Sequence, residues 1–297
     1  MGKLDVIAKS YMSRADRFAD AFNYFLYDGR QVVEADALHE LDTTEITVPI
    51  QRLRDLLKSW KILTDDKIIY VLLGVEIQGK IHYAMPVKNM LYDAMNYADQ
   101  VKQQGHKNRS ANINISSAEF LSGVKKNDKL IPVVNLTIYF GPEKWEGAKS
   151  LHELFDYDYK EILDYVPDYK LNLISPENID ANDFGKFKTQ LGQVLEYIKY
   201  SKDKKKLLET IQNNDNFKEV DAETVELINE ATGSKLKYKE KEGKVDMCQA
   251  IMDLKKDAML EGKIQAIVEL VKDDVITVAE AAKRLNISPE EFQNKYM

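Results

Sequence analysis

A carboxylate and a carboxamide come together at the end of one strongly apolar stretch of the chain. That stretch, residues 68–78, reads Ile-Ile-Tyr-Val-Leu-Leu-Gly-Val-Glu-Ile-Gln. Its β-branched aliphatic run is typical of a central strand that is covered on both faces. At a period of two residues, Glu76 and Gln78 share the face that turns polar only at this end. Taken alone, two such residues are more often a solvent-facing strand end than a site.

Asp55 is a further candidate, because the sequence predicts a hairpin that places it beside Glu76. Residues 55–63 are a predicted strand, residues 64–67 form a polar turn, and residues 68–78 return as the second strand. Asp55 begins the first strand and Glu76 ends the second, so the two are neighbours in an antiparallel pair. An open alternative is that residues 56–60 form a helical turn, which would leave Asp55 less well placed.

Helices are predicted on both sides of this hairpin. A helical stripe of apolar residues runs from Ser13 and stops at Asp28-Gly29, with Asp16 and Asp20 one turn apart on one face. A second helix begins with Pro86 at its first position and is expected to end near Gly105. Residues 105–117 then read as a polar loop whose cations are solvated.

The remaining strands are predicted before residue 175. Residues 130–140 and 169–174 are expected core strands, and residues 44–50 are a possible edge strand because Pro49 would cost a central strand a hydrogen bond. After residue 183 the pattern is helical, over residues 184–199, 204–211, 222–231 and 245–271. We therefore expect an α/β (α+β) core over residues 1–205 and a helical C-terminal region over residues 206–297.

The C-terminal tail, residues 277–292, has the pattern of a helix-turn-helix. Its second helix would begin Pro289-Glu-Glu, which is acidic at the end that should meet DNA bases. A structural helical hairpin is therefore the better interpretation. The charged residues 235–244 are a predicted linker.

Composition limits the kinds of partner. The chain has 42 Lys and Arg against 49 Asp and Glu, a net charge of −7, so any binding to nucleic acid must be local. Its one cysteine, Cys248, suits a reducing cytoplasm, and no run approaches the roughly 18 apolar residues of a membrane span. We expect a soluble, unprocessed cytoplasmic protein with no membrane association.

Several ordered motifs carry a resemblance to a known family, and they lie at residues 18–30, 40–45, 70–78, 82–93, 130–141 and 245–250. Together they resemble the recombination-promoting nuclease and putative transposase (Rpn) family, a branch of the PD-(D/E)XK nuclease superfamily. The resemblance covers most of residues 1–205. It implies a PD-(D/E)XK restriction-endonuclease-like core, a mixed sheet flanked by helices, and a metal-dependent DNA endonuclease linked to recombination or mobile elements.

The resemblance also implies roles for individual residues. Asp55 and Glu76 would bind Mg²⁺ or Mn²⁺, helped by the backbone carbonyl of Ile77, and Gln78 would occupy the place of the usual lysine. Asp20 would be the acid on the first helix that sometimes assists. Mg²⁺ prefers such oxygen ligands and keeps several waters, one of which can be polarised to attack a phosphodiester.

Gln78 is a departure, because glutamine is neutral and can only hydrogen-bond, whereas lysine can help to deprotonate water and offset phosphate charge. Lys88, near the start of the second helix, could contact phosphate, although an isolated surface lysine usually has no specific role. The alternatives are a catalytically weak or inactive DNA-binding or assembly protein that keeps the nuclease fold, and a protein-interaction module. Superfamily nucleases often dimerise to cut both strands, which makes a homodimer plausible by analogy.

Overall fold

The computed structural model describes residues 2–40, 55–63, 68–111, 116–156, 160–238 and 243–297. These residues form two compact units. The first unit comprises residues 1–210 and 226–234, and the second comprises residues 211–225 and 235–297. The domain boundary expected between residues 205 and 206 stays a prediction, because compactness does not show which part folds independently.

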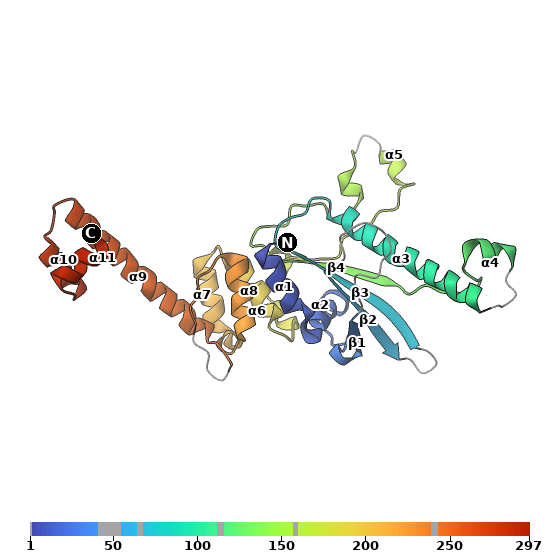
Figure 1. Ribbon diagram of the computed structural model, residues 1–297, viewed down its shortest axis with the longest axis horizontal. Coiled ribbons are helices and arrows are strands. Elements are labelled where there is room, and N and C mark those ends of the chain that lie inside the picture. Colours follow the sequence, from blue (N-terminus) through green and yellow to red (C-terminus); the bar gives the residue numbers. More distant parts are fainter. Residues whose placement is uncertain (1, 41–54, 64–67, 112–115, 157–159, 239–242) are drawn as a thin grey trace. The chain divides into compact units, whose positions relative to one another are not determined.

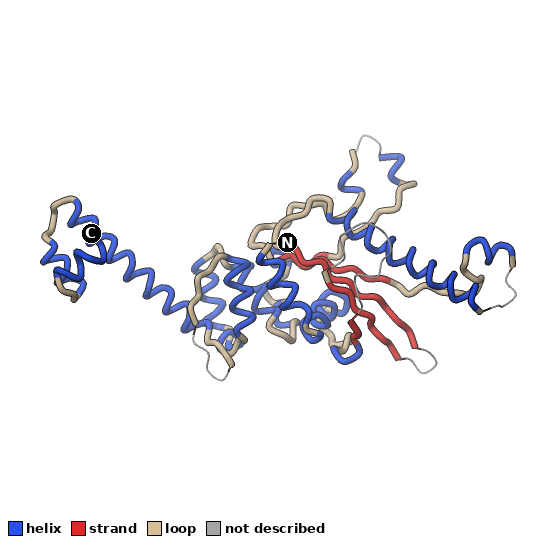
Figure 2. Tube along the Cα trace, in the orientation of Figure 1, coloured by secondary structure: helices blue, strands red, loops and turns tan. Residues whose placement is uncertain are grey.

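A five-stranded mixed sheet forms the centre of the first unit (Figures 1 and 2). Its strands are arranged in the order β1-β2-β3-β4-β5, and their bounds are β1 Leu38–Glu40, β2 Leu56–Leu63, β3 Ile68–Gln78, β4 Val133–Tyr139 and β5 Leu173–Ile174. The predicted β2–β3 hairpin is confirmed as an antiparallel pair, so the helical alternative for residues 56–60 is wrong. β4 and β5 are shorter than expected, and β1 is an edge strand that the sequence did not indicate.

Two predicted segments lie outside the described residues. They are the possible strand at residues 44–50 and the turn at residues 64–67, and the predicted linker at residues 235–244 also lies partly outside them. The expected positions of these segments therefore stay predictions.

The two faces of the sheet are covered by different helices. Lys58 of β2 lies opposite Leu73 of β3, and its ammonium donates to the carbonyl of Ser13 at the end of α1 (Lys3–Ser13). α1 and α2 (Ala15–Tyr27) therefore cover the face of Leu73. Thr137 of β4 lies beside Glu76 of β3 and accepts from Asn89 of α3 (Met85–Ser110), so α3 covers the opposite face. In Figure 1, α2 and α3 lie on opposite sides of the sheet.

α3 connects the parallel strands β3 and β4 and is longer than expected. The predicted stop at Gly105 is wrong, because the helix continues to Ser110. A side chain at Gly105 would lie 3.5 Å from the Cα atom of Gly123, which caps α4 (Ser117–Ser122) in the left-handed conformation at φ 75°. Gly105 therefore permits close packing of two backbones, and the loop expected over residues 105–117 is in part helical.

Helices dominate the described chain after β5, as expected. The short α5 (Lys160–Leu163) precedes β5. The helices after β5 are α6 Leu191–Tyr200, α7 Lys204–Asn213, α8 Ala222–Thr232, α9 Met247–Lys272, α10 Val278–Leu285 and α11 Pro289–Tyr296.

The end of α9 packs with α10 and α11 around a small core in the second unit. Ala281, Ala282 and Phe292 are fully buried there, together with Ile267 and Val271 of α9. The predicted tail hairpin is thus present as two helices, each capped at its start by a hydroxyl side chain. None of the helices described is long and apolar enough to cross a membrane.

Candidate functional site

Asp55 and Glu76 meet at one end of the β2–β3 hairpin, as predicted. Leu56 lies opposite Val75, so continuing the antiparallel register by one residue places Asp55 opposite Glu76. The Oδ2 atom of Asp55 accepts a hydrogen bond of 2.9 Å from the backbone N–H of Ile77. This bond links the two strands through the residue just before Leu56, the first residue of β2, and fixes the position of the Asp55 carboxylate.

Glu76 is a fully buried acid that pairs with a lysine from the next helix. Its Oε2 atom lies 2.7 Å from the Nζ atom of Lys88, and the exposed fractions of the two side chains are 1% and 26%. Lys88 also lies 5.7 Å from the centre of the Tyr92 ring. α3 begins at Met85, so Lys88 brings its ammonium to Glu76 from the first turn, the end of a helix that favours anions.

Buried polar side chains line the sheet face around Glu76. Thr137 lies beside Glu76 in the parallel register, and its hydroxyl accepts a 3.0 Å hydrogen bond from the amide of Asn89. Asn135, on the same face, lies beside Gly74. Among the described residues, Asn89 Oδ1 and both amide atoms of Asn135 have no hydrogen-bond partner. Because buried polar atoms are usually hydrogen-bonded, these unpartnered atoms favour a polar neighbour at this face over an apolar one.

Gln78 and Ile77 lie at the same end of β3. Gln78 follows Glu76 on the α3-facing side, is half-buried, and pairs in register with Tyr139 of β4. The Ile77 side chain is buried on the other side, so only its backbone could contribute to the site. The structure thus brings Asp55, Glu76, the Ile77 backbone and Gln78 together.

Asp20 is not brought to this group. It lies on α2, which covers the opposite face of the sheet, and its carboxylate holds the segment before α6. Asp20 accepts hydrogen bonds of 2.9, 2.9 and 2.6 Å from the Lys188 N–H, the Thr189 N–H and the Thr189 hydroxyl. Burial raises the pKa of Asp20, while these hydrogen bonds act to lower it. These contacts are structural, and the assisting role stays a prediction.

The donor set is compatible with a hard divalent cation. Asp55 and Glu76 supply carboxylates and Ile77 supplies a backbone carbonyl, and Mg²⁺ commonly takes one or two carboxylates and completes its shell with water. No cluster of three or more His, Cys, Asp or Glu suited to a metal occurs among the residues described. Lys88 already neutralises Glu76, so a cation would compete with this ammonium or share the carboxylate with it.

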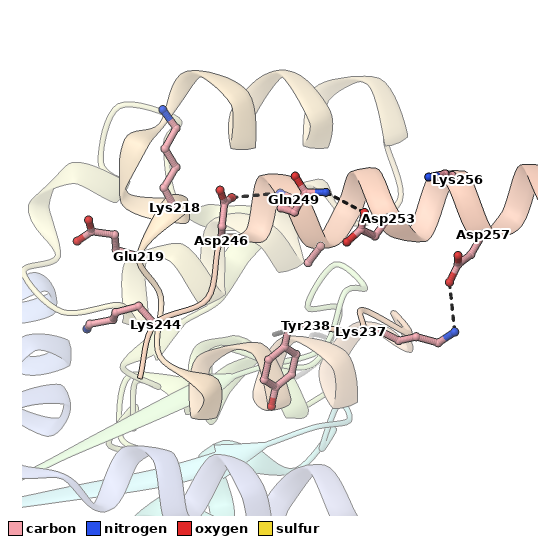
Figure 3. A pocket seen from close by; sticks show the side chains of 11 residues that line it. Lys218, Glu219, Lys237, Tyr238, Lys244, Asp246, Gln249, Asp253, Lys256 and Asp257 are labelled. Carbon is pink, nitrogen blue, oxygen red and sulfur yellow. Dashed lines mark hydrogen bonds and ion pairs between the residues drawn. The ribbon is translucent and has the colours of Figure 1, made fainter. Parts of the chain in front are cut away.

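A separate cavity of about 1090 Å³ lies in the second unit, beside α9 (Figure 3). Its charged lining residues are Lys218, Lys237, Lys244, Lys256, Glu219, Asp246, Asp253 and Asp257. Cations and anions balance there, and Lys237 pairs with Asp257 at 3.2 Å. The cavity therefore shows no preference for a ligand of either charge.

Sequence reasoning missed two parts of the polar site. Asn89 and Thr137 lie within ranges that carry the family resemblance, but no role was expected for either, although each is a polar residue at a position where an apolar residue would be expected in a helix or strand core. Lys88 was expected to be solvated or to contact phosphate, and its pairing with Glu76 was not anticipated. Comparison of the chain with family models, curated proteins and solved structures finds no match in any of the three.

Proposed function

We propose that this chain is a metal-dependent DNA endonuclease of the PD-(D/E)XK type, linked to recombination or mobile elements. The observation that carries the proposal is the meeting of Asp55, Glu76 and Lys88 at the point where a hairpin ends and a helix begins. Two acids and one ammonium at this place match the charge pattern that phosphodiester hydrolysis requires.

The order of the elements supports the same proposal. α2, β1, β2, β3, α3 and β4 occur in this order along the chain, with the short α4 between α3 and β4, an antiparallel β2–β3 hairpin and β4 parallel to β3. This is the order expected for a PD-(D/E)XK core. Asp55 and Glu76 occupy the hairpin positions that carry the acidic residues of that pattern.

Lys88 supplies the positive charge that Gln78 lacks. A lysine at position 78 would extend from β3, whereas Lys88 extends from α3 and reaches the carboxylate of Glu76. In the proposed site, the Lys88 ammonium keeps its pair with Glu76 and would donate a second N–H to the scissile phosphate, where it would stabilise the developing negative charge. Gln78 hydrogen-bonds and orients a water molecule through its amide without changing its own charge.

Asp55 and Glu76 would hold Mg²⁺ or Mn²⁺, together with the Ile77 carbonyl. When bound, such a cation offsets the repulsion between the two carboxylates and lowers the pKa of water. The hydrogen bond from the Ile77 N–H engages one Asp55 oxygen, and the other oxygen would be the one to bind the cation.

Nicking of supercoiled DNA in Mg²⁺ tests this proposal. We expect nicking that EDTA abolishes and that falls at least about a hundredfold in Asp55→Ala and Glu76→Ala. Lys80→Ala, at an exposed position after β3, is the matched surface control. Nicking in EDTA, or full activity in both acid variants, would reject the proposal.

The second candidate is a DNA-binding or assembly protein that keeps this fold and has lost catalysis. The Lys88–Glu76 pair favours it, because the ammonium neutralises the buried carboxylate without any metal. Calorimetry separates the two candidates: DNA binding without any heat of Mg²⁺ or Mn²⁺ binding identifies the inactive protein. The homodimer and the cytoplasmic location stay predictions, the first of which sedimentation velocity can test.

A further inference from the structure

The far end of α3 is strongly basic in an otherwise acidic chain. Residues 102–129 hold six Lys and Arg against two Asp and Glu, a net charge of +4, whereas the whole chain carries −7. We call the C-terminal part of α3, with α4 and residues 123–129, the basic arm. Its positive charge is local, as any nucleic-acid surface of this chain must be.

Both acids of the basic arm, Glu119 and Asp128, accept hydrogen bonds from other residues of the arm. The Glu119 carboxylate accepts hydrogen bonds from the backbone N–H groups of Ser116 and Lys126. Asp128 accepts from the amide of Asn108 and from the N–H of Lys125. These bonds hold the pKa of each acid below its usual value, so both acids are charged and the net charge of +4 already includes them.

The outward surface offers exposed cations and an exposed aromatic ring. Lys107, Lys126 and Lys129 are exposed, and the Arg109 guanidinium lies 5.9 Å from the centre of the Phe120 ring, which is 61% exposed. The arm keeps this shape because Gly105 and Gly123 allow the backbones of α3 and α4 to approach closely. A fixed cluster of cations is suited to the regularly spaced charges of a phosphate backbone.

We propose that the basic arm binds the phosphate backbone of duplex DNA away from the Asp55–Glu76 site. This inference rests on the proposed function for the identity of the substrate. α3 is uninterrupted from Lys88 to Lys107, 19 residues later, which corresponds to about 28 Å of helix rise. At about 3.4 Å per base pair, a duplex lying along α3 must extend over roughly eight base pairs to reach both places.

Fluorescence anisotropy with duplex DNA in EDTA tests the arm without cleavage. The arm variant is Lys107→Gln/Lys126→Gln/Lys129→Gln, and the matched control is Lys204→Gln/Lys205→Gln/Lys206→Gln, which removes the same charge from exposed positions of α7. We expect the arm variant to bind a 20-base-pair duplex about tenfold or more weakly, with a salt slope smaller by up to about 3. The control should bind like the wild type.

The dependence of affinity on duplex length is a second test of the basic arm. Between duplexes of about six and about twelve base pairs, the affinity of the wild type should rise more than that of the arm variant, because only the longer duplex can reach from Lys88 to the arm. Equal loss in arm variant and control, or no duplex binding by the wild type, would overturn the arm assignment.

Nicking assays on the same proteins separate the two proposals. If the wild type does not nick but the arm variant alone loses DNA binding, the proposed nuclease function fails and the arm stands. If the wild type nicks and the arm variant binds normally, the nuclease function stands and the arm fails.

Discussion

Replacement of Lys88 by Met tests the ion pair on which the site depends. The substitution removes the ammonium and keeps much of the side-chain bulk, while Glu76 has no exposed area to rehydrate. Removing one partner of a buried ion pair costs about 3 to 5 kcal/mol, because the other charge stays buried. Since the Lys88 side chain is 26% exposed, we expect the lower end, about 3 kcal/mol.

Thermal unfolding in EDTA measures this loss. A change of 1 kcal/mol shifts the Tm of a chain of this size by about 2 to 4 °C, so Lys88→Met should melt roughly 6 to 12 °C lower than the wild type. Lys80→Met is the matched control, because Lys80 is exposed and a surface change of this kind is worth about 0.5 kcal/mol or less.

Magnesium should then restore part of the stability. In Lys88→Met, Mg²⁺ no longer competes with the lysine ammonium for the Glu76 carboxylate. A ligand present at a hundred times its Kd stabilises the folded state by about 2.7 kcal/mol. We expect Mg²⁺ to raise the Tm of Lys88→Met more than that of the wild type. An unchanged Tm in EDTA would refute the contribution of the ion pair, and an equal response to Mg²⁺ would refute a cation site at Glu76.

Two further substitutions and one chemical modification test other parts of the fold. Asp20→Asn should lower the free energy of unfolding in urea by about 1 to 3 kcal/mol, because an amide NH₂ would face buried N–H donors; unchanged stability would contradict this role. Burial raises the pKa of the Cys248 thiol, so less thiolate is present at pH 8 and iodoacetamide should alkylate the native protein several-fold more slowly than the urea-unfolded chain. Gly123→Ala forces a side chain into a left-handed residue, 3.1 Å from the Gly105 Cα, and hydrogen exchange in α4 should accelerate by an amount equivalent to about 1 to 3 kcal/mol. Gly262→Ala, in the open middle of α9, is the control and should be neutral or stabilising.

The hairpin could be predicted because its information is local. Alternation along residues 68–78 identifies a strand, and the short polar turn before it forces the previous strand to run antiparallel. Once both strands are assigned, Asp55 has to lie near Glu76. This part of the site followed from periodicity and needed no knowledge of other elements.

The end of α3 could not be predicted, because a tertiary contact overrides the local signal. Glycine after an apolar stripe usually ends a helix, and Gly105 follows such a stripe. Here the missing side chain admits the backbone of Gly123, which lies 18 residues further along the chain. Local sequence does not distinguish a glycine that ends a helix from one that another backbone approaches.

Lys88 and Asp20 show the same limit at the site itself. Both are charged residues on helices that flank the sheet. Sequence position alone did not indicate which of the two side chains would reach Glu76. The helix that follows β3 crosses the face on which Glu76 lies, so a lysine in its first turn can reach that carboxylate. The helix that precedes the sheet covers the other face, where Asp20 holds Thr189. A charge missing from the end of a strand is therefore best sought in the first turn of the helix that returns over the same face.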